Sequence, residues 1–422
     1  MKTYINKIYL QLFIYVFLIY IIFNKGVSYT FLTEFIVIIG ILLTINLNKN
    51  KFVIYFDNNY AILLFLLIVG FLYFIYGVYN YKINGVIQDS LFFLYISNVF
   101  ILLTFTEYYD TLIKLLFNIY KWVPVIGFVN FILQNYSSFF ENYSAFGGLP
   151  LMLYKYGDLG VNLAISTLLF LENKYNLNKT TSFLFALLII INLLIVLTYS
   201  RSGFIAYSIT LFCYYIFSNN IKKGFLKKNI KYVFFTLIIA IPLYTTFEVK
   251  ENFQGRTTGL NQIINNINSF ISSSSEFKFN NTLNNNIIWR FAWWSNIIEN
   301  SINEKMILSG VGSGADLIKD AGVLVEDTNL RAPHSIHFNI LARYGILFFF
   351  VWIAWIFLTL RPLFLKKLDG DNFLLTLFLL AFLINASFDV YLEGPMGGFP
   401  FWVWVGLLLM NKNKKIPLFA KS

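Results

Sequence analysis

The only two histidines of the chain lie three residues apart in the stretch PHSIHFNILARYG, residues 333–345. This spacing puts His334 and His337 on roughly one face of a helix. Imidazole can bind a metal, act as a general base near neutral pH, or fill a structural position. A zinc site needs three or four protein ligands, but the chain has no third histidine, and its single cysteine, Cys213, lies inside an apolar run. A metal site is therefore not expected, and a general base and a structural pair remain as the two interpretations.

Arginine is the second chemically informative residue, with six arginines against 26 lysines. A guanidinium grips phosphate through two parallel hydrogen bonds and keeps its charge, so arginines gathered on one side of the molecule indicate an anionic ligand, above all phosphate. The alternative is that they pair with acidic side chains or reach toward lipid headgroups. Five of the six map to one side of the topology derived below: Arg201, Arg256, Arg290, Arg331 and Arg343.

Two segments present the arginines most clearly. Arg201 interrupts the apolar stretch LIVLTYSRSGFIAY (194–207), where the chain is expected to turn between two helices through Ser202 and Gly203. A charge at membrane depth is a functional candidate. Arg290 lies in IIWRFAWWSNIIEN (287–300), which has Trp289, Trp293 and Ile297 at helical spacing. We expect this segment to be an amphipathic helix on the membrane surface, whose tryptophans anchor it there or stack on sugars.

The stretch GVGSGAD (310–316) is rich in glycine, as phosphate-binding loops are. It matches neither nucleotide-binding pattern, and the topology puts it outside the cell. The sequence therefore favours a tight turn over a phosphate cradle.

The elements that must position these residues are membrane helices. Apolar residues make up 58% of the chain and charged residues 13%, against about 25% charged in soluble domains. Apolar runs long enough to cross a bilayer recur almost from end to end. The sequence predicts an all-α polytopic membrane protein, residues 1–422 forming one unit, with about twelve transmembrane helices near 8–23, 31–47, 60–79, 90–107, 113–134, 158–172, 181–199, 203–218, 232–247, 336–360, 373–389 and 398–410.

Orientation follows from the basic loops, because positive charge in short loops favours the cytoplasmic side. The loop NNIKKGFLKKNIK (219–231) is the strongest marker, and strict alternation then puts every other strongly basic short loop and both termini in the cytoplasm. The same alternation sends one large loop, 248–333, to the outer side, where we expect it to carry short surface helices. The net charge of +11 is thus explained by topology, and no nucleic-acid partner is expected.

Four elements in order, LTYSRSGFIAY (197–207), the Arg290 segment, GVGSG (310–314) and PHSIHFNILARYG, resemble the O-antigen ligase and O-antigen polymerase superfamily of bacterial envelope glycosyltransferases. The resemblance covers roughly residues 190–405, including SFDVYLEGPMGGFPFWVWVGLLL (387–409), whereas the first half is similar only in hydropathy. It implies transfer of a glycan from a polyprenyl diphosphate carrier to a sugar hydroxyl, outside the bacterial inner membrane and without a cofactor, nucleotide or metal.

The resemblance also implies roles for individual residues. His334 matches the histidine proposed to deprotonate the acceptor hydroxyl, and Arg201 and Arg290 match arginines that hold the diphosphate. His337 has no counterpart, so a supporting role is expected, as for Arg256, Arg331 and Arg343. The chain departs from the family pattern at Ser335, where asparagine is common, and at Arg343, where an acidic residue is common.

Modest length, heavy use of Asn, Ile, Phe and Lys and an idiosyncratic first half favour a polymerase of O-antigen or capsule repeat units over a ligase that hands finished glycan to lipid A-core. The expected partners are the polyprenyl-diphosphate-linked oligosaccharide, the lipid bilayer, and chain-length regulator and flippase proteins. A multi-span transporter or flippase is the alternative of another class. It would place charged groups at the midplane of several spans and show repeat symmetry, neither of which the sequence indicates.

Overall fold

The structure is a computed structural model of the 422-residue chain. It describes residues 2–28, 30–47, 58–136, 150–218, 332–365 and 370–414, together with shorter pieces at 239–242, 244–245, 263, 290–291, 293–299, 302, 307–317 and 368. Most of the expected outer loop, 248–333, and most of the expected span at 232–247 lie outside the described residues. Arg256, Arg331 and Trp289 lie outside them as well.

The described residues form helices and no strands, so the all-α prediction is confirmed for this part of the chain. Apolar runs become helices because a helix satisfies its own backbone hydrogen bonds where no water is present. The labelled helices are α1 Lys2–Phe23, α2 Leu32–Leu47, α3 Asn58–Asn80, α4 Ile83–Leu103, α5 Tyr109–Tyr120, α6 Val123–Tyr136, α7 Tyr156–Leu171, α8 Lys179–Tyr199, α9 Arg201–Phe217, α13 Ile336–Phe364, α14 Gly370–Ala386 and α15 Pro395–Lys414, with short 3₁₀ turns η1 at Asn24–Val27 and η3 at Thr106–Tyr108.

Five of these helices, α1, α3, α4, α8 and α13, are long and apolar enough to cross a membrane. A sixth span results if α5 and α6 count as one, since they meet at a bend of 41° where a single span at 113–134 was expected. Helices α2, α7 and α14 are apolar but shorter. The membrane character of the chain is thus supported, whereas the count of twelve spans is not confirmed.

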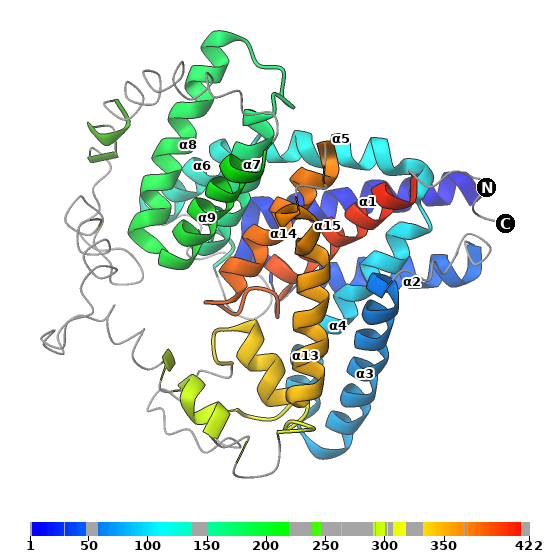
Figure 1. The fold of residues 1–422 in the computed structure, drawn as a ribbon. Coiled ribbons are helices and arrows are strands. Elements are labelled where there is room, and N and C mark those ends of the chain that lie inside the picture. The colour runs from blue at the N-terminus through cyan, green and yellow to red at the C-terminus, as the bar shows by residue number, and fades with distance from the viewer. Residues whose placement is uncertain are drawn as a thin grey trace, which may run out of the picture.

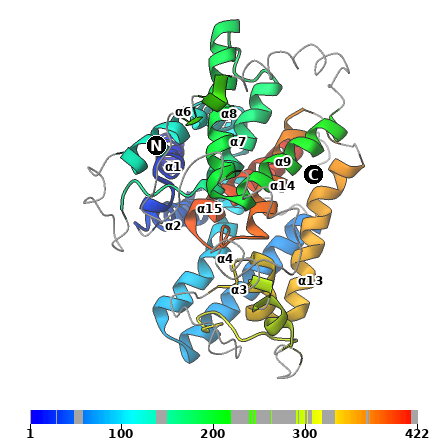
Figure 2. The same cartoon turned by 90° about the vertical axis from the view of Figure 1, so that its left-hand side faces the viewer.

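Helices α14 and α15 lie in the middle of the molecule, with α7, α8 and α9 on one side and α3 and α13 on the other (Figures 1 and 2). Helices α7 and α9 cross with their backbones in contact: a Cβ on Gly160 would lie 2.6 Å from the Gly203 carbonyl carbon, and one on Gly203 would lie 2.7 Å from the Gly157 oxygen. Close packing of this kind holds helices together in lipid, where burial of apolar surface contributes little. It fixes the first turn of α9 beside the first turn of α7.

A single residue separates α8 from α9. Ser200 is extended, at φ −146° and ψ 109°; its amide still bonds back to Val196 of α8, and its hydroxyl accepts a hydrogen bond from the Gly203 amide of α9. Serine suits this position because its side chain satisfies one of the free amides at a helix start. Arg201 therefore becomes the first residue of α9. The turn between the two helices is confirmed, but it lies at Ser200, whereas Ser202 and Gly203, where it was expected, are inside α9.

Helix α13 is not the continuous span expected at 336–360. It breaks at Gly345, where φ is +78° and ψ is 176° (Figure 1). The glycine-rich segment 307–314 packs into the break: the Val311 and Gly312 amides donate to the carbonyls of Ala342 and Arg343, and the Ile346 amide donates to the Ile307 carbonyl. The first part of α13, residues 336–344, is thus a separate short helix that starts beside both histidines.

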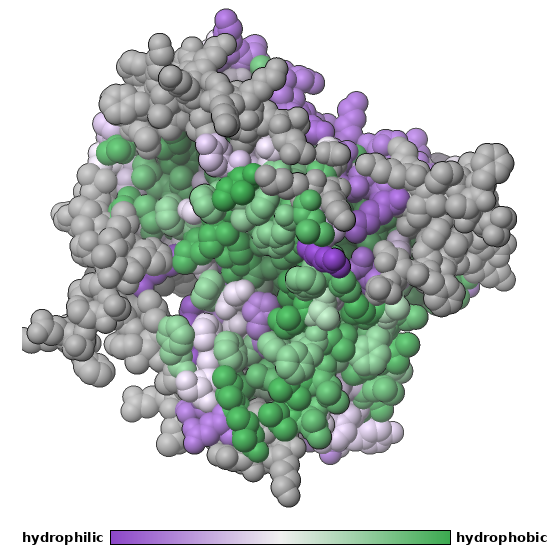
Figure 3. Space-filling view, viewed as in Figure 1, coloured by the Kyte–Doolittle hydropathy of each residue, from purple (hydrophilic) through white to green (hydrophobic). Residues whose placement is uncertain are grey.

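Hydrophobic side chains cover the face of the molecule over α3 and α13, as expected for a surface that meets lipid (Figure 3). Along α13 the exposed apolar residues recur at helical spacing, at Leu347, Phe350, Ile353 and Phe357. The same view shows this face hollowed between the upper and lower groups of helices, with hydrophilic residues around the hollow.

Candidate active site

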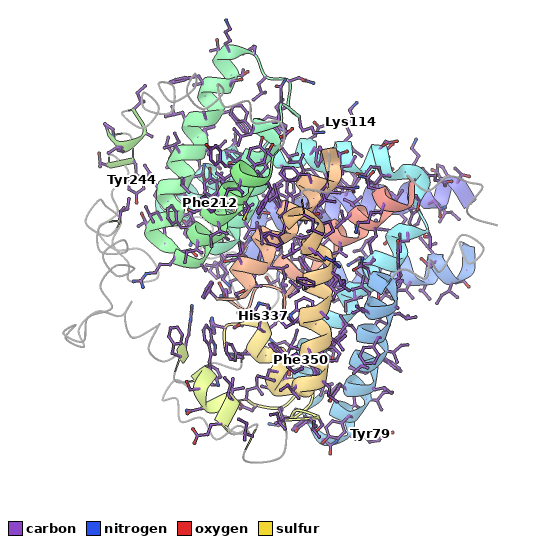
Figure 4. All side chains as sticks on the ribbon, in the orientation of Figure 1. Tyr79, Lys114, Phe212, Tyr244, His337 and Phe350 are labelled. Carbon is purple, nitrogen blue, oxygen red and sulfur yellow. The ribbon has the colours of Figure 1, made fainter. Side chains whose placement is uncertain are left out.

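Five segments that are distant in sequence meet at one end of the central helices. They are the starts of α7, α9 and α13, the segment 387–394 between α14 and α15, and the segment 290–299. His337 marks the start of α13 in Figure 4, near the middle of the molecule and beside the hollow that Figure 3 shows. The outer-side segments of the predicted topology therefore converge on one place.

Asp389 is the centre of this cluster. One of its carboxylate oxygens, Oδ2, lies 2.8 Å from Nζ of Lys155, the residue that precedes α7. The other, Oδ1, lies 3.6 Å from Nδ1 of His334 and accepts a hydrogen bond of 2.8 Å from the Val390 amide. The side chains of Lys155 and His334 are each 23% exposed and that of Asp389 is 12% exposed, so all three are partly buried but not sealed off.

The electrostatics keep Asp389 ionised and Lys155 charged. Burial alone would raise the pKa of Asp389, but Lys155 and the His334 side chain hold this pKa well below its usual range. Burial likewise favours neutral Lys155, yet the Asp389 and Asp158 carboxylates raise its pKa. A carboxylate facing Nδ1 favours the imidazole tautomer that carries its proton on that nitrogen, so the lone pair of this tautomer is on Nε2.

The backbone of His334 is in the left-handed region, at φ +52°. A residue other than glycine adopts this conformation at a cost of about 1–3 kcal/mol and keeps it where the surrounding structure demands it, often at a functional site. The preceding residue is held in place because the Trp294 indole N–H donates a 2.7 Å hydrogen bond to the Pro333 carbonyl. The turn at His334 points its side chain toward Asp389 and away from the helix that begins two residues later.

Of the two arginines expected to bind diphosphate, Arg290 contacts the Asp389 segment, and Arg201 begins the helix that packs on the start of α7. Arg290 donates a 2.9 Å hydrogen bond from NH1 to the carbonyl of Phe388, next to Asp389, and its charge interacts with that of Asp389. Arg201 begins α9, whose Ser200 hydroxyl would lie 3.1 Å from a Cβ placed on Gly157, two residues after Lys155. The positive end of the α9 dipole adds to the charge of Arg201.

His337 lies one turn further along and has partners on both ring nitrogens. The Trp352 indole N–H donates to Nδ1 at 3.2 Å, and Nε2 lies 3.0 Å from the Ser387 hydroxyl. Since an indole nitrogen can only donate, Nδ1 must be the acceptor and Nε2 carries the proton. The ring joins α13 to the end of α14, which fits the supporting role expected for it better than that of a base.

Arg343, expected as a supporting residue, lies away from the cluster and is fully buried. Its guanidinium contacts the Asp89 carboxylate at 2.8 Å, the Asn339 side chain and the Ala315 carbonyl. Asp89 also accepts a 2.8 Å hydrogen bond from the Gly314 amide. The amides of Val311, Gly312 and Gly314 thus donate to protein groups, as expected for a tight turn and not for a phosphate-binding loop. Arg343 of α13 connects this turn to Asp89 of α4.

The tryptophans of the segment 290–299 do not face the membrane as expected. Trp293 is fully buried against Val311, Ala315 and Ala342, and Trp294 stacks on Phe338 with ring centroids 4.7 Å apart. The exposed large apolar residues of this segment are instead Phe291 and Ile298, about two turns apart. The tryptophans pack on the protein, and this packing places Arg290 at the cluster.

Lys155 and Asp389 were missed as site residues by the sequence reasoning. Each lies just outside an apolar run, where a single charge is typical of a helix end. The signal that would have found them is their common placement on the predicted outer side, together with Arg201 and His334. Among the described residues, no group of three or more His, Cys, Asp and Glu side chains is placed to hold a metal ion.

Glu393 is a further acidic residue near the site, and its burial raises its pKa to about 8, although Arg343 opposes this. In the unfolded chain the same group titrates near 4.3, so between these pH values the folded protein holds a proton that the unfolded chain has lost. Stability should therefore fall as the pH rises from 5 to 8. We expect the melting temperature of Glu393→Gln to exceed that of the wild type by an amount that increases from pH 5 to pH 8. If the two melting temperatures change in parallel with pH, Glu393 does not have a raised pKa.

Comparison with known proteins adds one finding about this region. Residues 184–353 match a family model described as O-antigen ligase. The matched range begins in α8, ends in the second part of α13 and contains Arg201, Arg290 and His334. Lys155 and Asp389 lie outside it. A comparison with curated proteins found no match.

Proposed function

We propose that this chain, whose residues 184–353 place it in the O-antigen polymerase and ligase superfamily, polymerises polyprenyl-diphosphate-linked oligosaccharide repeat units of a surface polysaccharide. The product is the polysaccharide part of lipopolysaccharide or a capsule. The observation that carries the proposal is the convergence of His334, Arg290 and Lys155 on Asp389 at one end of the central helices.

The reaction joins a sugar hydroxyl of one repeat unit to the anomeric carbon of the growing glycan. The hydroxyl oxygen forms the new bond to carbon, its proton passes to Nε2 of His334, and the bond between the anomeric carbon and the diphosphate oxygen breaks. The diphosphate leaves with the electron pair and is held by Arg201 and Arg290. A positioned base contributes about 10²–10⁴ in rate, and fixed guanidiniums stabilise the charge that develops on the leaving group.

Asp389 assists this reaction through His334. As the imidazole takes up the acceptor proton it becomes a cation, and the carboxylate 3.6 Å from Nδ1 then forms an ion pair with it. Because Lys155 keeps Asp389 ionised, the charge is present before the proton moves. No metal or nucleotide takes part in the proposed reaction, since cleavage of the bond between the anomeric carbon and the diphosphate oxygen of the donor supplies the energy.

The proposal includes the topology derived from the basic loops. Twelve spans place both termini in the cytoplasm, and the cluster and the loop 248–333 lie outside the bacterial inner membrane, where the lipid-linked repeat units are presented. Support comes from the cluster itself, because every segment that meets at Asp389 belongs to the side that charge alternation puts outside. A transporter is disfavoured for the same reason: the charged residues gather at one end rather than at the midplane.

Ligation of finished glycan to lipid A-core is the second candidate, favoured by the description of the matching family. Both activities use the same base and the same diphosphate site, and they differ only in the acceptor. Deletion of the gene separates them. We expect the deletion strain to carry surface lipid bearing a single repeat unit in place of a ladder, on a gel of its surface glycan. Full-length polymer stranded on the polyprenyl carrier would instead identify a ligase.

A further inference from the structure

Lys155 is one of two lysines that form matching ion pairs at the two ends of α7. At the start of the helix Lys155 Nζ lies 2.8 Å from Asp389, and beyond its end Lys174 Nζ lies 2.8 Å from Asp371 at the start of α14. The ends are about 24 Å apart at 1.5 Å per residue. Their surroundings differ: the charges of Lys25 and Arg290 repel that of Lys155, whereas Lys174 Nζ lies 5.9 Å from the centroid of the Phe117 ring.

The cations around Lys155 come from three further segments. Lys25, in the 3₁₀ turn after α1, is close enough to Lys155 for their charges to repel, and Arg290 repels Lys155 in the same way. The turn is fixed there, since the Gly26 amide donates to the Leu153 carbonyl and the Asn24 side chain accepts from the Lys155 amide. Arg201 begins the adjacent helix α9.

This arrangement costs folding energy. Like charges held together in a partly buried place disfavour the folded state. Three cations, Lys25, Lys155 and Arg290, interact with two acidic groups, Asp158 and Asp389, which leaves positive charge in excess. A partly buried cluster with excess positive charge is the arrangement expected for binding an anion.

Lys155 has the donors to bind such an anion while it stays paired. An ammonium carries three N–H donors, and Asp389 is its one ion-pair partner in the described structure. The side chain is 23% exposed, so it is only partly covered by the protein. The position before α7 adds the free amides of a helix start, and Lys155 sits on the same carboxylate as the proposed base.

We propose that Lys155 is a third binding residue for the diphosphate of the polyprenyl-linked donor, with Lys25 adding charge beside it. The inference rests on the proposed function and assigns part of the diphosphate site to the N-terminal half of the chain, outside residues 184–353. Lys155 thereby links the two halves of the reaction: it binds the leaving group and keeps Asp389 ionised opposite His334.

The test measures binding of undecaprenyl diphosphate to the purified full-length protein in nanodiscs, with undecaprenyl monophosphate as a second probe. A hydrogen bond to a charged group contributes about 1.5–3 kcal/mol, which corresponds to a loss of affinity of about 10- to 100-fold. We expect this loss for the diphosphate lipid in Lys155→Met and a smaller loss for the monophosphate lipid. Lys155→Arg should bind within about threefold of the wild type, because the charge is kept. Lys174→Met is the matched control and should bind as the wild type does.

A double variant separates ligand binding from simple charge balance. Lys155→Met alone leaves the Asp389 carboxylate without its ion-pair partner. The double variant Lys155→Met and Asp389→Asn removes both charges, so the net charge of the site stays as in the wild type. If Lys155 binds the diphosphate, the double variant still binds undecaprenyl diphosphate weakly. Wild-type affinity of the double variant for this lipid would overturn the inference. Failure of the wild-type protein to bind undecaprenyl diphosphate would overturn the proposed function instead, so the two failures are distinguishable.

Discussion

Replacing His334 by alanine is expected to abolish chain elongation while the protein still inserts into the membrane in normal amounts. The His334 imidazole lies 3.6 Å from Asp389 and is the proposed base, and loss of a general base lowers a rate by about 10²–10⁴. The measurement is the glycan ladder of a deletion strain that carries the variant gene, with protein abundance measured alongside.

Three companion variants make this result specific. Arg201→Ala and Arg290→Ala should also remove the ladder, but through weaker binding of the diphosphate lipid, whereas His334→Ala should bind this lipid normally. His337→Gln is the matched control, since glutamine keeps a donor and an acceptor for Ser387 and Trp352, and it should retain a ladder. Normal chain lengths in His334→Ala would refute its role as the base.

Arg343→Met is expected to have the largest effect on stability. Its removal leaves the Asp89 carboxylate without the guanidinium, and breaking a buried ion pair on one side costs about 3–5 kcal/mol. The glycine-rich turn and the start of α13 depend on the same contacts, so the site should be lost with the fold. The melting temperature of the purified protein and its abundance in membranes measure this effect.

The partner variant provides the control. Asp89→Asn combined with Arg343→Met removes both charges, so the double variant should be more stable than Arg343→Met alone. An Arg343→Met protein with a wild-type melting temperature and no activity would contradict the structural role, and would assign the guanidinium to the substrate.

The sequence was most informative where chemistry is carried by rare residues. With two histidines and six arginines, the few candidates could be examined one by one, and the structure places His334 and Arg290 at the same aspartate. Helix positions also followed from hydropathy, because a long apolar run has no stable alternative in lipid. Arg201 was expected at a sharp turn, and it begins a helix after the single residue Ser200.

What the sequence could not show depends on contacts between distant segments. The break at Gly345 lies inside an apolar run that reads as one span, and it exists because the segment 307–314 supplies the hydrogen bonds. Trp293 and Trp294 have the spacing of a membrane anchor, but packing against Ala342 and Phe338 turns them inward. Hydropathy cannot distinguish an apolar face that meets lipid from one that meets protein.

Arg343 stands where the family that the sequence resembles commonly has an acidic residue, and a contact between distant segments explains this difference. This chain places the cation on α13 and the acidic residue, Asp89, on α4. The position thus supports the fold, and the departure leaves the chemistry of the cluster around Asp389 unchanged.

The central claim is that the chain elongates a lipid-linked glycan by itself. The direct measurement uses the purified protein in liposomes with a synthetic undecaprenyl-diphosphate-linked repeat unit, without nucleotide and with a chelator present. We predict a ladder of longer lipid-linked glycans, with one undecaprenyl diphosphate released for each unit added. Unchanged repeat units, with transfer occurring only when lipid A-core acceptor is added, would contradict polymerisation.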